Sequence, residues 1–161
     1  MFSVSRRKPF GCYLLIVLHL FLGLGALFGG GALIFSPDGS LLKMPLEMLE
    51  HSPFESFLIP GIILFVVLGV IPIFIAFYLI FEKSIPIAEK LSLYQNIHWA
   101  WNGSLYMGFT LIIWIGIELY MIQGIAFIHI LYLFLGLIIQ AVTLLPSVKQ
   151  HYSQNTAYYL K

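Results

Sequence analysis

Charged side chains are scarce in this sequence, and their scarcity decides which solvent the chain can fold in. Asp, Glu, Lys and Arg make up 9% of the 161 residues, whereas hydrophobic residues make up 60%. Soluble domains carry roughly 25% charged residues, so this chain has too few to cover a surface in water. The formal net charge of +1 also excludes the basic face of a nucleic-acid-binding protein, and we expect no nucleic-acid partner.

Cysteine is nearly absent as well. The single cysteine, Cys12, excludes an internal disulfide and any metal site built from several cysteines. It stands at the start of an apolar run, where we expect a buried, unreactive thiol. The other residues show no convincing spacing of metal ligands or of a nucleophile and its base. The sequence therefore predicts no catalytic residue, no metal site and no cofactor.

Long apolar runs are what the sequence has in abundance. A helix needs roughly 20 apolar residues to cross a hydrocarbon core about 30 Å thick, and backbone groups in lipid must pair within the segment. Four segments meet this requirement, at about 11–35, 57–81, 97–121 and 125–145. The sequence therefore predicts an all-α membrane protein, a four-transmembrane-helix bundle that forms a single domain over residues 1–161 in the lipid bilayer.

The positions of the basic residues predict the orientation of the bundle. The N-terminus, the loop between the second and third spans and the C-terminal tail share one side, and they hold seven of the eight Lys and Arg residues, all except Lys43. Loops rich in Lys and Arg stay in the cytoplasm, so both termini are predicted to be cytoplasmic in a multi-pass protein of the cell membrane. Residues 6–8 before the first span resemble a signal peptide, but that span exceeds the usual 7–15 apolar residues, and we interpret it as a retained helix.

The loop between the first two spans is predicted to cap the outer end of the bundle. From about Pro45, apolar residues alternate with Glu47 and Glu50, and Pro is tolerated at the first position of a helix. We expect a short amphipathic outer helix here, on the membrane surface. The acids of this loop are Asp38, Glu47, Glu50 and Glu55. We interpret them as solvated charge, with a cation or substrate site as the alternative.

Glu118 is the one acid within the four spans, and acids inside a membrane are candidate functional residues. It lies five residues before Gln123, and His129 lies five residues after Gly124, in the short turn between the last two spans. At about 1.5 Å per residue, both lie roughly 7 Å from the turn, which predicts a Glu118–His129 hydrogen bond or ion pair. We interpret this pair as a structural clasp, with a proton or cation relay, or a polar anchor for a ligand, as the alternative.

The spans contain five other polar residues of interest, of which His98, Asn102 and Gln140 are predicted to lie at similar depths near the cytoplasmic side, with His19 somewhat deeper. They are His19, His98, Asn102, Tyr132 and Gln140. They are candidates for a polar lining through the bundle, although hydrogen bonds between helices are the favoured interpretation. A metal or haem site built from the histidines is disfavoured because their predicted depths differ.

Small residues in the first span predict a helix-packing face. Gly25 and Gly29 form a GxxxG pair, and Ala26 and Gly30 repeat the spacing. Such spacing lets two helix backbones approach closely. We expect the partner helix in the same chain; a homo-oligomer or another membrane protein is the alternative.

The stretch PDGSLLKMPLEMLEHSPFESFLIPGIILF, residues 37–65, resembles an uncharacterised family of small four-helix bacterial integral membrane proteins. The resemblance extends to TLIIWIGIELYMIQ at 110–123 and HILYLFLG at 129–136. It implies a four-span protein of the bacterial inner membrane, and it carries over no activity and no catalytic residue.

These patterns together favour a non-enzymatic accessory or structural membrane module that acts through helix or loop contacts. The alternative is a small transporter or channel subunit that uses Glu118 and the polar face of the fourth span. Four helices rarely enclose a large pathway, so that alternative would need an oligomer. An intramembrane enzyme would need a nucleophile–base or metal constellation, which the spacing does not provide.

Overall fold

The computed structural model describes residues 7–159, with side chains up to Ser153, and within this range it contains helices and no strands. The elements are α1 (Phe10–Phe35), the 3-10 turns η1 (Ser40–Leu42) and η2 (Leu46–Leu49), α2 (Leu58–Ile63), the π-helical segment η3 (Leu64–Val70), α3 (Ile71–Phe81), α4 (Pro86–Lys90), α5 (Trp99–Ile122), α6 (Phe127–Leu144) and α7 (Pro146–Tyr159). In the described part of the chain, four helices are long and apolar enough to cross a membrane: α1, the continuous rod α2–η3–α3, α5 and α6. The prediction of an all-α protein with four such helices is confirmed.

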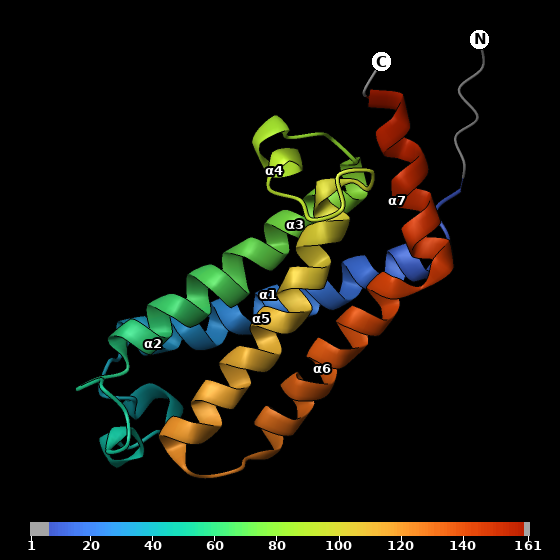
Figure 1. The fold of residues 1–161 in the computed structure, drawn as a ribbon. Helices are drawn as coiled ribbons and strands as arrows, with labels where there is room; N and C mark the ends of the chain where they lie inside the picture. Colours follow the sequence, from blue (N-terminus) through green and yellow to red (C-terminus); the bar gives the residue numbers. More distant parts are fainter. Residues whose placement is uncertain (1–6, 160–161) are drawn as a thin grey trace.

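The four long helices run alternately up and down the bundle (Figure 1). The start of α1, the end of α3, α4, the start of α5 and α7 gather at one end, which we call the terminal end. The turns η1 and η2 and the α5–α6 connection lie at the opposite end, the loop end. α1 packs against the α2–η3–α3 rod and against α6, and α5 packs against α6 and α3. Arg6 and Lys161, which contribute to the predicted orientation, lie outside the described residues.

The outside of the bundle is apolar on every long helix. Large hydrophobic side chains are about half exposed on each of them, for example Val17 on α1, Phe77 on α3, Ile113 on α5 and Phe134 on α6. Soluble monomers rarely expose contiguous apolar surface on this scale. In lipid such a surface is matched to its solvent, so the exposed side chains fit a multi-pass membrane protein.

Glycines bring the backbones of α1 and the α2–η3–α3 rod into contact. A Cβ atom on Gly30 would lie 2.6 Å from the backbone nitrogen of Phe65 and 2.8 Å from the carbonyl oxygen of Gly61. On the facing rod, a Cβ atom on Gly61 would lie 2.8 Å from the Cβ atom of Leu33. Neither position 30 nor position 61 has room for a side chain, because the atoms that would have to move belong to the main chain or lie next to it.

The predicted packing face is therefore only partly a helix crossing. Gly30 lies at the crossing, and Ala26 is buried nearby in the core. The GxxxG pair does not act together as predicted. Gly25 lies beneath the hydroxyl group of Tyr132 on α6, and Gly29 has room for a Cβ atom, whose nearest neighbour would be Leu64 at 3.6 Å. The spacing of the small residues predicted a packing face on α1, but it did not predict which neighbouring residue each glycine contacts.

The outer loop folds back over the loop end. The expected amphipathic helix is reduced to the 3-10 turn η2, which begins directly after Pro45. Leu49 at the end of η2 is buried with Phe57 and Leu33 in a small apolar cluster. This cluster attaches the loop to the end of α1, so the loop forms a packed cap.

The rod α2–η3–α3 contains an irregularity next to Pro72. Proline lacks a backbone N–H, and its ring clashes with the carbonyl group four residues earlier. That carbonyl belongs to Leu68, within the π-helical segment η3. A π-helical turn is wider than an α-helical one, so it makes room for the ring, and the distortion that a proline causes inside a helix takes this form here.

Replacing Gly30 by alanine should destabilise the bundle. The added Cβ atom would collide with backbone atoms of the facing rod, and overpacking of this kind costs about 1–3 kcal/mol. Unfolding of the micelle-embedded protein by a denaturing detergent would measure the change. Gly116→Ala on α5 is the matched control, because its Cβ atom would meet nothing within 4 Å. Equal stability of the two variants would contradict the close crossing.

Candidate ligand cavity

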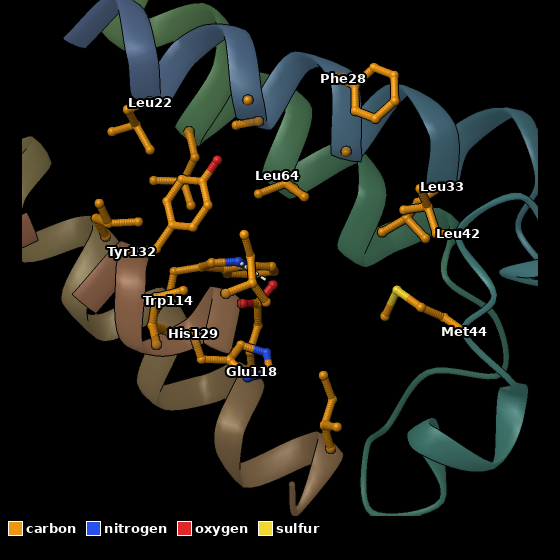
Figure 2. A pocket seen from close by; sticks show the side chains of 18 residues that line it. Leu22, Phe28, Leu33, Leu42, Met44, Leu64, Trp114, Glu118, His129 and Tyr132 are labelled. Atoms are coloured by element: carbon orange, nitrogen blue, oxygen red, sulfur yellow. Dashed lines mark hydrogen bonds between the residues drawn. The ribbon is translucent and has the colours of Figure 1, made fainter. Parts of the chain in front are cut away.

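A cavity of about 400 Å³ lies in the half of the bundle nearest the loop end (Figure 2). It is enclosed by α1, η3, α5 and α6, with η1 and the turn after it on one side. Leu22, Leu68 and Leu111 are lining residues that are almost completely buried, and they also belong to the main hydrophobic core. Because that core continues to the terminal end, the cavity is closed on that side.

Most of the cavity wall is apolar. Leu33, Leu42 and Met44 lie opposite α5 and α6 (Figure 2). Gly25 and Gly29 of α1 also border the cavity, and since they carry no side chain they leave it wide. These two of the four predicted helix-packing residues thus widen a cavity, whereas Gly30 lies at the helix crossing.

Four side chains on α5 and α6 form what we call the polar wall: Trp114, Glu118, His129 and Tyr132. The Trp114 indole N–H donates a hydrogen bond to Oε1 of Glu118 over 2.7 Å. The backbone N–H of Ala126 donates to Nδ1 of His129 over 3.1 Å, at the start of α6. His129 thereby satisfies one of the N–H groups that every helix leaves unpaired at its beginning.

The predicted Glu118–His129 hydrogen bond is not present among the described residues. Each side chain is bonded within or next to its own helix, and the two share a cavity wall instead (Figure 2). The physical reason is local. Trp114 lies four residues before Glu118, a spacing at which helix side chains meet directly, so the carboxylate finds a donor without crossing to α6.

The predicted polar lining does not form a continuous path. Tyr132 borders the cavity, whereas His19, His98, Asn102 and Gln140 do not. His19 is fully buried in α1 and its Nδ1 donates to the carbonyl oxygen of Leu15 over 3.0 Å. The side chain of Gln140 packs against Gly108 on α5. His19 and Gln140 are thus embedded in different parts of the bundle.

His98 and Asn102 work at the terminal end instead. Asn102 donates to the carbonyl oxygens of Tyr94 and Ile97 over 3.1 Å and accepts from the Tyr94 N–H over 3.0 Å. Nδ1 of His98 accepts from the backbone N–H of Ala100, and Nε2 donates to the carbonyl oxygen of Lys83. His98 therefore caps the start of α5 in its neutral form and joins it to the segment after α3.

A charged cluster that sequence analysis did not anticipate joins α3 to α7. Nζ of Lys8 lies 2.7 Å from Oε1 of Glu82, and Nε2 of His151 lies 3.0 Å from the same oxygen. Burial alone would raise the pKa of Glu82, but the hydrogen bonds and charges of His151 and Lys8 outweigh burial and hold the pKa at about 2. The helix α7 was missed because its sequence is polar; Pro146 at its first position was the available signal.

Comparison with known proteins gives no indication of the function of this chain. No protein-family model, curated protein or solved structure matches the chain. Within residues 7–159, no group of three His, Cys, Asp or Glu side chains is arranged to hold a metal ion. The cavity and its polar wall are therefore the features from which a function has to be argued.

Acidification should destabilise the cap at His98. Burial lowers the pKa of His98 below its ordinary value, so the folded state favours the neutral ring. The resulting stability is complete above pH 6.5, the pKa of an unfolded histidine, and is lost as the pH falls through the lower folded pKa. Thermal unfolding of the solubilised protein between pH 8 and pH 5 would measure the loss.

His98→Asn is the control for this effect. Asparagine is a good N-cap residue and does not titrate in this range, so this variant should lose less stability on acidification than the parent. Identical pH profiles of the two proteins would contradict the role assigned to His98.

Proposed function

We propose that the protein is a non-enzymatic membrane module that holds one amphiphilic molecule in the cavity near its loop end. The observation that carries the proposal is the cavity itself, about 400 Å³ of mainly apolar lining with a few polar side chains along one wall. Binding sites for small molecules have this character: they measure roughly 300–1,000 Å³ and combine an apolar lining with a few polar groups.

The rim of the cavity supports entry from the membrane. Phe28 of α1 is 75% exposed and Ile128 of α6 is 50% exposed, and both border the cavity. The cavity is thus bordered by exposed residues of two helices whose outer surfaces are apolar. An amphiphile dissolved in the bilayer can enter sideways, without passing through water.

The same geometry disfavours the transporter or channel alternative for a single chain. The hydrophobic core continues from Leu22, Leu68 and Leu111 to the terminal end, so the cavity offers no path across the bundle. An enzymatic role is disfavoured too. Glu118 and His129 are bonded to Trp114 and Ala126 and not to each other or to a nucleophile.

The proposal includes the orientation expected from the basic residues. At the terminal end the described chain carries Arg7, Lys8, Lys83, Lys90 and Lys149, whereas Lys43 lies in the loop that caps the other end. This asymmetry favours a cytoplasmic terminal end, and the resemblance to bacterial proteins favours the inner membrane. The cavity then opens in the outer half of the bilayer.

Single added cysteines would test the orientation. Cys12 is buried, so an exposed second cysteine reports on its own position. In intact spheroplasts a membrane-impermeant maleimide should label Glu47→Cys, in η2, and should label Gln150→Cys, in α7, only after the membrane is permeabilised. Both residues are exposed. The opposite pattern would overturn the orientation.

Quenching of Trp114 would test occupation of the cavity. We expect 12-bromododecanol to quench it saturably when the full chain is held in phosphatidylcholine nanodiscs, because the indole borders the cavity. Gly29→Leu should weaken this binding by about tenfold or more, equivalent to about 1.4 kcal/mol, because a side chain at position 29 projects into the cavity. Gly116→Leu is the control, and Trp114→Phe identifies the signal of Trp114. Unsaturable quenching that is unchanged by Gly29→Leu would overturn the proposal.

A further inference from the structure

Glu118 has an unusual position among the cavity residues, because it is the one acid there and has no basic partner. Its Oε1 accepts the hydrogen bond from Trp114. No described residue donates a hydrogen bond to its other oxygen, Oε2, and the carboxyl group lies at the cavity (Figure 2). Among the described residues, none that borders the cavity is Lys or Arg.

The other polar groups of the wall do not supply a positive charge in this arrangement. His129 accepts a hydrogen bond through Nδ1, which a doubly protonated imidazolium could not do. The hydroxyl group of Tyr132 lies against Gly25 and carries no charge. An opposite charge close to a buried carboxyl group favours its ionised form. No described residue supplies that charge at Glu118, so a cationic ligand is the partner with which its carboxylate would pair.

We infer that the amphiphile held in this cavity is cationic, with an ammonium group that pairs with Glu118 and an apolar body that lies against Leu33, Leu42 and Met44. This inference rests on the proposed function and names the ligand class for the same cavity. An ammonium group donates to Oε2 while Trp114 keeps Oε1 in place. An anionic amphiphile meets a carboxylate of its own sign and no basic side chain.

The charge at the loop end supports the same ligand class. The loop at this end has four exposed acids, Asp38, Glu47, Glu50 and Glu55. Its basic side chains of the Lys or Arg type are limited to Lys43. The hydrogen bonds from Ser36 and Ser40 lower the pKa of Asp38, so this carboxylate is ionised at neutral pH. A surface of one sign raises the local concentration of ligands of the opposite sign. The acidic loop thus favours cations near the cavity, and Glu118 selects among the molecules that enter.

Three probes with the same chain length would test the inference. Dodecylamine, which is protonated at pH 7, dodecanol and dodecanoate would be titrated calorimetrically into the full chain in phosphatidylcholine nanodiscs, with empty nanodiscs as the reference for partition into lipid. We expect dodecylamine to bind about tenfold tighter than dodecanol or better, as a hydrogen bond to a charged group allows. Dodecanoate should bind most weakly.

Glu118→Gln isolates the charge from the fold. Glutamine keeps an oxygen that can accept the Trp114 hydrogen bond, so the variant should fold as the parent does. Its affinity for dodecylamine should fall to about that for dodecanol, and its affinity for dodecanol should change much less than its affinity for dodecylamine. Gly29→Leu should weaken binding of both probes, because it narrows the cavity without touching Glu118.

The outcomes separate this inference from the proposed function. Equal affinities for dodecylamine and dodecanol, unchanged by Glu118→Gln but lowered by Gly29→Leu, would overturn the cationic ligand and leave the binding module standing. Tighter binding of dodecanoate than of dodecylamine would overturn it as well. No saturable binding of any probe would overturn the proposed function and this inference with it.

Discussion

The need to pair every backbone polar group inside lipid is the constraint on which this structure depends. It forces helices across the membrane, and it also governs the buried hydroxyl and indole groups. Ser104 donates to the carbonyl oxygen of Ala100 over 2.9 Å, and Thr143 donates to that of Ile139 over 2.6 Å. The indole of Trp101 reaches the carbonyl oxygen of Thr143 over 2.7 Å and so links α5 to α6. These side chains thus bond to the backbone that the helices already organise.

The constraint is most severe where a helix ends, because its last carbonyl groups have no partner in the helix. At the end of α3, Nζ of Lys8 donates to the carbonyl oxygens of Leu79 at 2.5 Å and Ile80 at 2.7 Å. The hydroxyl group of Tyr152 on α7 donates to Leu79 as well, over 3.1 Å. A cation at a helix C-terminus also interacts favourably with the helix dipole. The end of α3 therefore holds both the segment before α1 and the helix α7 in position.

The features that follow from the need to match lipid or water could be predicted from the sequence. The features that depend on which side chain lies nearest could not. The four spans followed from apolar runs, and the depths assigned to Glu118 and His129 from the hairpin bring both to one cavity wall. Their bond did not follow, since a donor one turn away on the same helix competes with a partner on another helix. The contact of Gly25 with Tyr132 and the packing of α7 depend on contacts between segments far apart in the sequence, which hydrophobic periodicity alone does not specify.

For the proposed binding module, competition with bilayer lipid for the cavity would make a single carboxylate decisive for what binds there. Lipid chains are as apolar as the side chains that line the cavity, so transfer of an apolar body from the bilayer gains little by the hydrophobic effect. Shape and van der Waals contact would also be available to the acyl chains of a surrounding bilayer, because Phe28 and Ile128 border the cavity and are exposed. What a bulk lipid chain lacks is a group that satisfies Glu118. Selectivity over the membrane itself must therefore come from the polar wall, and the apolar lining serves to keep that wall dry and its charge interactions strong.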